Sequence, residues 1–148
     1  MRNILIILIL VLVTGCGFKP IYSSNKISFS IIDIEFKNNL LNKKISDQIK
    51  RLSNNDSENK FTLKLDTKKE KLIKAKNKRN IPSIFELKIR LDLTVIDESG
   101  EKKLKKFSKQ SKYNYNEDKF QLSRYEKELE NILVNQLVLE VLEFLSNE

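Results

Sequence analysis

The chain offers few residue types that do chemistry. It has one cysteine and no histidine among 148 residues. The sequence therefore excludes the common zinc and transition-metal sites, the Cys–His and Ser–His nucleophile pairs and the usual proton shuttle. Its three glycines, Gly15, Gly17 and Gly100, do not form a glycine-rich phosphate-binding loop. We expect a protein that is not an enzyme and that needs no cofactor.

Carboxylates are the remaining candidates for catalysis. Asp33 and Glu35 stand two positions apart in a predicted strand, which puts them on one face about 7 Å apart. Two carboxylates at this distance could form the acid pair of an envelope hydrolase. No neighbouring residue suggests a shifted pKa or a nucleophile, so the sequence favours ordinary surface acids.

Cys16 is the most informative group. Arg2 is followed by an apolar run over residues 4–13, which is typical of a signal peptide. The run is too short for the roughly 20 apolar residues of a membrane-spanning helix. The small pair Thr14-Gly15 before Cys16 resembles a bacterial lipobox, which implies removal of residues 1–15, thioether-linked diacylglycerol on Cys16 and acylation of the new amine. The alternative, a secreted protein with a free thiol, is disfavoured in an oxidising compartment.

The predicted organisation is a signal peptide over residues 1–15, a lipidated tether over 16–26 and one domain over 27–148. The formal net charge of +8 suggests anionic partners such as lipid phosphates, acidic polysaccharide or a membrane surface. The alternative is that lysine is abundant because the genome is rich in A and T. We expect no nucleic-acid partner, because the signal peptide removes the chain from the cytoplasm.

Hydrophobic periodicity predicts six elements. Residues 27–36 read as a strand whose phase slips by one residue, which indicates a bulge or burial on both faces. Residues 41–52 have helical spacing, with Asn38 or Asn39 as N-cap. A strand opens at 61–65 and continues towards residue 75, and Pro82 marks a loop. Residues 85–95 alternate as a half-buried strand, residues 97–100 form a turn, and a lysine-rich strand follows over about 102–115.

The tail, about residues 117–146, reads as one long helix. Leu133 and Leu137 lie on its broad apolar side, whereas Ile132 and Leu139 stand among polar residues. Such a helix is either fully covered within the domain or meets a partner on its second side. The element order β-α-β-β-β-α predicts an α+β fold, with two helices on one face of a mixed sheet of about four strands. The basic middle and acidic tail predict an electrically two-sided molecule.

The run Cys16-Gly17-Phe18-Lys19-Pro20-Ile21-Tyr22 resembles the start of mature lipoproteins of the LptE family, in its α-proteobacterial form. The usual pattern after the cysteine is Gly-Phe-x-Pro-Leu-Tyr, and Ile21 departs from it mildly. The chain length and element order also match that family. Beyond the first seven mature residues the resemblance is architectural.

The resemblance implies a lipid-anchored protein on the periplasmic side of the outer membrane. It would plug and support assembly of an LptD-type β-barrel and contact lipopolysaccharide. Gly17 is consistent with outer-membrane sorting, since Asp there would resemble a retention signal. The candidate residues are Cys16 for lipidation, Lys102, Lys103, Lys105 and Lys106 for lipopolysaccharide, and Phe18, Pro20, Tyr22, Ile132 and Leu139 for the barrel.

A second reading from another class stays open. In this reading the chain is a stand-alone basic envelope lipoprotein that binds anionic envelope polymer or membrane surface without a barrel partner. The lysines after the turn at residues 97–100 also have a purely structural explanation, because a lysine-rich edge strand resists unwanted strand pairing.

Overall fold

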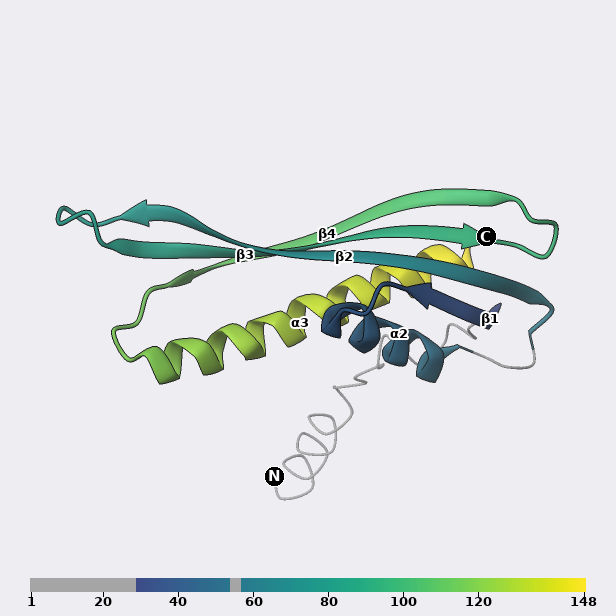
Figure 1. Ribbon diagram of the computed structural model, residues 1–148, viewed down its shortest axis with the longest axis horizontal. Helices are drawn as coiled ribbons and strands as arrows, with labels where there is room; N and C mark the ends of the chain where they lie inside the picture. Colours follow the sequence, from purple (N-terminus) through teal and green to yellow (C-terminus); the bar gives the residue numbers. More distant parts are fainter. Residues whose placement is uncertain (1–28, 54–56) are drawn as a thin grey trace, which may run out of the picture.

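The computed structural model describes residues 29–53 and 57–148. Their elements are β1 (Phe29–Phe36), α2 (Leu40–Leu52), β2 (Asn59–Lys76), β3 (Pro82–Ile96), β4 (Lys102–Asn114) and α3 (Lys119–Ser146). The strands form one sheet in the order β1-β2-β3-β4 (Figure 1). β1 is parallel to β2 and the other neighbours are antiparallel. The predicted α+β fold is confirmed, whereas the predicted signal peptide and tether lie outside the described residues.

β1 carries the predicted phase slip. Its pairing with β2 shifts register between Ile31 and Asp33, so a bulge lies at Ile32, whose side chain is exposed. Ile34 returns to the core and Glu35 to the opposite face, where it pairs with Lys64. The parallel pairing needs a crossover connection, and α2 provides it.

α2 begins where its capping residue predicts. Asn39 has an extended backbone, and its side chain accepts a hydrogen bond from the Leu41 N–H at 2.9 Å. One narrow stripe, Leu41, Ile45 and Ile49, is buried against the sheet. This arrangement confirms the predicted amphipathic helix and the Asn39 cap.

The long hairpin of β2 and β3 is more continuous than the sequence indicated. β2 runs unbroken through the lysine-rich stretch to Lys76, and the turn occupies residues 77–81. Pro82 is already the first residue of β3, a strand position where the missing N–H is tolerated. Along β3, the predicted alternation from Phe85 to Val95 is confirmed, since all six apolar residues of that phase are buried.

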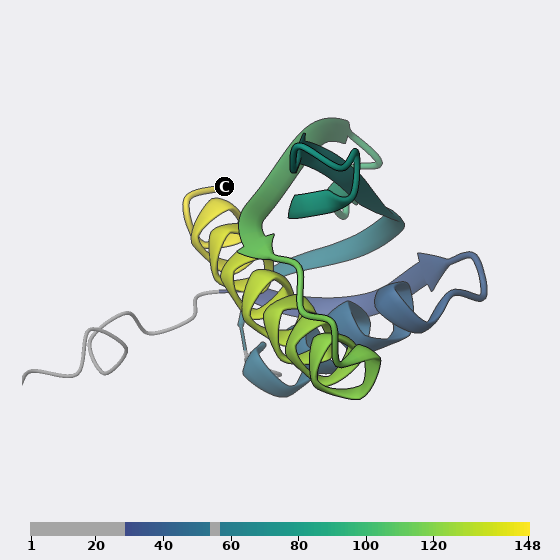
Figure 2. The same cartoon turned by 90° about the vertical axis from the view of Figure 1, so that its left-hand side faces the viewer.

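α3 spans the length of the sheet. It begins at Lys119 because the Asp118 carboxylate caps it, accepting hydrogen bonds from the N–H groups of Phe120 and Gln121. Leu133 and Leu137 are buried, whereas Ile132 is 52% exposed and Leu139 is 36% exposed, as the helical wheel predicted. Seen from the end, α2 and α3 lie beneath one side of the twisted sheet (Figure 2). The core lies between that side and the helices.

Beyond the end of β1, the side chain of Asn42 forms a hydrogen bond with the backbone of β2. Asn42 is fully buried, and its Oδ1 accepts a hydrogen bond from the Thr67 N–H at 3.0 Å. Its amide nitrogen donates to the Lys37 carbonyl at 3.1 Å. The helix α2 is thereby joined to β2 at the point where the sheet narrows from four strands to three.

Candidate anion-binding and partner surfaces

The four lysines predicted to contact lipopolysaccharide lie at the start of β4. Because side chains alternate along a strand, they lie on two different sides of the sheet. Lys103 forms an ion pair with Glu148, next to the end of α3, and Lys105 Nζ lies 5.5 Å from the Phe144 ring centroid. Lys102 and Lys106 fall in the opposite phase, on the face away from the helices. Neither has an ion-pair partner among the described residues. The structure therefore does not bring the four lysines together.

The turn that precedes these lysines is acidic. The Asp97 carboxylate accepts hydrogen bonds from the Ser99 hydroxyl at 2.7 Å and the Glu101 N–H at 2.9 Å. The hydrogen bond from Ser99 is the main cause that holds the pKa of Asp97 below its usual value. Glu98 lies 3.7 Å from Lys60. Gly100 has a φ of 84°, the left-handed conformation that such a turn needs.

The acidic tail faces the basic strands. Three ion pairs run along α3, and they join Lys69 to Glu130, Lys71 to Glu126 and Lys109 to Glu140. A fourth joins Lys103 to Glu148, just past the end of the helix. Exposed pairs of this kind contribute only about 0–1 kcal/mol each. They nevertheless neutralise much of the charge that the sequence assigned to two separate sides. The two charged regions meet at the helix–sheet interface instead of forming opposite poles.

One of these pairs is embedded in an aromatic cluster. The Tyr113 hydroxyl donates to Glu126 at 2.7 Å, and Lys71 Nζ lies 4.4 Å from the Phe85 ring centroid. Burial raises the pKa of Glu126, but hydrogen bonds from Lys71 and Tyr113 outweigh it, so the net pKa is lowered. Burial and the same carboxylate raise the pKa of Tyr113. The cluster fastens the first half of α3 to the sheet.

The β2–β3 turn is the most cationic tip among the described residues. Lys76, Lys78 and Arg79 have no ion-pair partner within residues 29–53 and 57–148. The Asn77 side chain shapes the turn by accepting hydrogen bonds from the Arg79 and Ile81 N–H groups at 2.9 and 3.0 Å. An open hollow of about 420 Å³ lies beside it, lined by Asn77, Lys78, Arg79, Ile81, Pro82, Ser83, Tyr115 and Glu117.

Sequence reasoning missed this tip. The basic middle of the chain was recognised, but the candidate anion site was placed on the lysines that follow the turn at residues 97–100 and not on the turn before β3. The available signal was the run Lys74 to Arg79, which contains four cationic residues and no acidic residue. Exposed apolar groups, including Phe120 at 72% and Ile81 at 44%, lie in the adjoining segments. Cations and apolar side chains together suit an amphiphilic anion better than a purely polar one.

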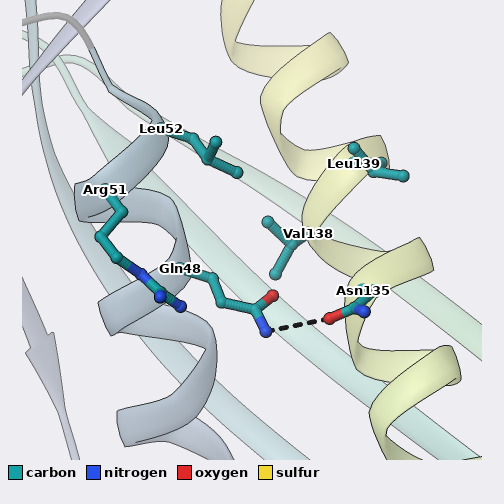
Figure 3. Close-up of a pocket in the computed structure, with 6 residues that line it drawn as sticks. All are labelled: Gln48, Arg51, Leu52, Asn135, Val138 and Leu139. Atoms are coloured by element: carbon teal, nitrogen blue, oxygen red, sulfur yellow. Dashed lines mark hydrogen bonds between the residues drawn. The ribbon is translucent and has the colours of Figure 1, made fainter. Parts of the chain in front are cut away.

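A second hollow lies between the helices and contains one predicted partner residue. It measures about 350 Å³ and is lined by Gln48, Arg51, Leu52, Asn135, Val138 and Leu139. Figure 3 shows Gln48 and Asn135 meeting across it, with an amide–amide hydrogen bond of 2.9 Å. Ile132, the other predicted contact on α3, is exposed but does not line this groove.

The remaining predicted residues are placed as follows. Cys16, Phe18, Pro20 and Tyr22 lie outside the described residues. Glu35 is engaged with Lys64 at 2.7 Å, and the Asp33 carboxylate accepts a hydrogen bond from the Ile34 N–H at 2.8 Å. Among the described residues no group of three or more potential ligands is placed to hold a metal ion, and no helix is long and apolar enough to cross a membrane.

Solved structures share this fold at low sequence identity. A minor lipoprotein from Acinetobacter baumannii matches with a TM-score of 0.59 and 14% identity, over 82% of this chain and 92% of that one. Lipoprotein B from Nitrosomonas europaea matches with a TM-score of 0.60 and 14% identity, over 78% and 83%. A lipoprotein from Caulobacter crescentus gives 0.55 and 11%, over 82% and 89%. No protein-family model and no curated protein matches the sequence. The chain thus has the fold of several bacterial proteins named as lipoproteins.

Proposed function

We propose that this chain is an outer-membrane lipoprotein subunit of the lipopolysaccharide translocon. In this role it is lipidated at Cys16, plugs and supports assembly of an LptD-type β-barrel, and contacts lipopolysaccharide without catalysing a reaction. One observation carries the proposal: a cysteine in lipobox context precedes a domain whose fold recurs in lipoproteins over most of both chains. The Phe18, Pro20 and Tyr22 pattern adds the resemblance to the LptE family.

The described surface supports contact with a phosphorylated lipid. Lipid A and core sugars carry phosphates and carboxylates, which lysine and arginine bind as charged partners. Lys78 and Arg79 stand at the β2–β3 turn, and Lys102 and Lys106 stand on the outer face; none of the four has an ion-pair partner among the described residues. Lys103 and Lys105 belong to the predicted set but are already in contact with α3. Several cations must act together, because one exposed ion pair contributes little.

The barrel contact is proposed to use apolar groups that the domain leaves exposed. Ile132 and Leu139 lie on the outward side of α3, opposite the buried Leu133 and Leu137. A protein held inside a barrel lumen would cover such groups and so gain their burial free energy.

The test is affinity capture of the chain from outer membranes in mild detergent, followed by mass spectrometry. We expect a large outer-membrane β-barrel to copurify, and the mature N-terminus to be Cys16 with a triacyl mass. The Ile132→Asp variant is expected to keep its fold and lose the barrel. An intact signal peptide or inner-membrane residence would overturn the localisation.

The alternative function is a stand-alone basic envelope lipoprotein. The observation that favours it is the set of outer-face cations that have no ion-pair partner within the described part of the chain. Such cations need no barrel to attract an anionic surface. Two results would together select it: capture without a barrel, and salt-sensitive binding to anionic vesicles that lack lipopolysaccharide.

A further inference from the structure

The groove between α2 and α3 has a polar part, where hydrogen bonds bridge the two helices, and an apolar part near the end of α2. The amide pair Gln48–Asn135 bridges the helices, and Lys44 bonds to Asn131 one turn further along. Towards the end of α2, Leu52 is 44% exposed and Leu139 is 36% exposed, while Val138 is buried between them (Figure 3). Arg51 is turned back along its own helix, where its Nε donates to the Asp47 carbonyl at 3.2 Å. The mouth of the groove is therefore lined mainly by aliphatic side chains.

We propose that residues 17–22 of this same chain occupy the groove, with Phe18, Pro20 and Tyr22 packed against Leu52, Val138 and Leu139. The tether would then be a docked strap that fixes the domain to its anchor. This inference needs neither a barrel partner nor lipopolysaccharide. It assigns Leu139 and the tether to contacts within the chain, which leaves Ile132, outside the groove, as the exposed side chain of the predicted α3 pair that is available to a barrel.

The segment that precedes Phe29 enters the domain close to the groove. Phe29 pairs with Asn59 at the start of β2, and α2 ends at Leu52 shortly before that residue. The end of α3 lies at the same place, because Glu148 and Phe61 line one small pocket. Leu139 is about 14 Å from that end along the helix axis. The extended segment from Tyr22 to Phe29 reaches about 23 Å, so the chain entering β1 can return into the groove.

The chemistry of the segment fits a narrow apolar groove. Pro20 fixes its own φ and favours an extended backbone at Lys19. In an extended chain, alternate side chains share one side, so Phe18, Pro20 and Tyr22 face the same way while Lys19 points to solvent. A hollow of about 350 Å³ holds apolar side chains of this size but no globular partner.

Docking would set the orientation of the domain at the membrane. Cys16 lies two residues before Phe18, so a docked tether brings the lipid attachment point beside the α2–α3 groove. The helical layer near Leu52 would then face the membrane, and the cationic β2–β3 turn, at the other end of the sheet, would project away from it (Figure 1). An undocked tether imposes no such orientation.

The experiment measures thiol accessibility in the full-length lipoprotein in detergent. Leu139→Cys is labelled with a maleimide, and the peptide that contains residue 139 is quantified by mass spectrometry with and without Phe18→Ser and Tyr22→Ser. We expect the intact tether to slow labelling at least about tenfold, because buried aromatic side chains shift the population to the docked state. Leu52→Cys should behave alike. Leu104→Cys, on the outer face and 80% exposed, should be unaffected by the tether substitutions.

Equal labelling rates with the intact and the serine-substituted tether, in variants whose thermal midpoints agree, would overturn the inference. So would protection that survives the serine substitutions and appears only when a barrel copurifies, which would assign the groove to that partner. Protection that rises with protein concentration would assign it to a second copy of the chain and would equally overturn it. Loss of the barrel from the captured material, with tether-dependent protection retained, would overturn the proposed function alone.

Discussion

The two ends of the sheet are built differently. At one end, which we call the core end, β1 begins, α2 and α3 end, and the β3–β4 turn closes. At the other, the hairpin end, the β2–β3 turn stands beside the start of α3. Four strands and two helices enclose the core end, whereas three strands and one helix make up the hairpin end (Figure 1). Burial is accordingly concentrated near the core end, where Ile45, Ile49 and Leu137 are fully enclosed.

Charge follows the same division. Near the core end, Lys60 and Lys103 have acidic partners in Glu98 and Glu148. At the hairpin end, Lys78 and Arg79 have none among the described residues. Lysine density along the sequence is similar in the two places, so it does not reveal which cations remain available. The fold decides this, by bringing distant glutamates to one set and leaving the other at a projecting turn.

The largest expected effect tests whether the core end carries the stability. Leu137→Asp should cost about 3–5 kcal/mol of unfolding free energy, because it buries an unpaired charge where the native side chain is fully enclosed. Leu139→Asp, two positions along on the outward side, should cost less than about 1 kcal/mol. Urea unfolding followed by circular dichroism measures both. Equal losses would show that the second side of α3 is also core.

A smaller effect is expected at the junction between the two ends. Asn42→Ala removes the acceptor for the buried Thr67 N–H and the donor to the Lys37 carbonyl, so it should cost about 1–3 kcal/mol. Asn77→Ala removes two similar hydrogen bonds in an exposed turn, where water replaces them, and should cost less than about 1 kcal/mol. If the two variants are equally stable in urea, Asn42 does not join α2 to β2.

The elements and their buried faces were predictable because each rests on local pattern. Alternation identified β3, the one-residue phase slip identified the bulge at Ile32, and Asn39 identified the start of α2. The helical wheel alone separates the buried Leu137 from the partly exposed Leu139. In each case neighbours a few residues apart determine the outcome, so one sequence is sufficient.

The partners of the lysines were not predictable because they come from distant parts of the chain. Lys69 and Glu130 are 61 positions apart, and Lys71 and Glu126 are 55 positions apart. Their meeting depends on α3 returning along the whole sheet, which no local pattern specifies. The division of Lys102 and Lys106 from Lys103 and Lys105 follows from strand periodicity alone and could have been predicted.

The pH dependence of stability should separate the hairpin end from the rest. Because the pKa of Glu126 is lowered below its usual 4.5, this carboxylate stabilises the fold above that value, and its contribution is lost as the pH falls through the folded pKa. Glu126→Gln should lower the unfolding free energy by about 1 kcal/mol at pH 7 and flatten its decline below pH 4.5. The control is Glu128→Gln, whose side chain is 60% exposed. If both variants and the unchanged chain have parallel pH profiles, Glu126 does not contribute to the pH dependence of stability.

The smallest effect on stability, and the most direct on function, is expected from charge reversal at the two turns. Lys78→Glu with Arg79→Glu should change the unfolding free energy by less than about 0.5 kcal/mol, since both groups are exposed and neither has an ion-pair partner among the residues that the structure describes. Binding to purified lipopolysaccharide should weaken at least about tenfold, because two attractions become repulsions. Lys103→Glu with Lys105→Glu should weaken binding less and stability more, because these lysines contact Glu148 and Phe144. Lys102→Glu with Lys106→Glu reports on the outer face separately.

Binding by the unchanged chain should fall as salt rises past physiological ionic strength, where the Debye length is about 8 Å. If the tip variant binds as tightly as the unchanged chain while the Lys102 and Lys106 variant does not, the anion site lies on the outer face near the core end, and the contrast drawn between the two turns is wrong.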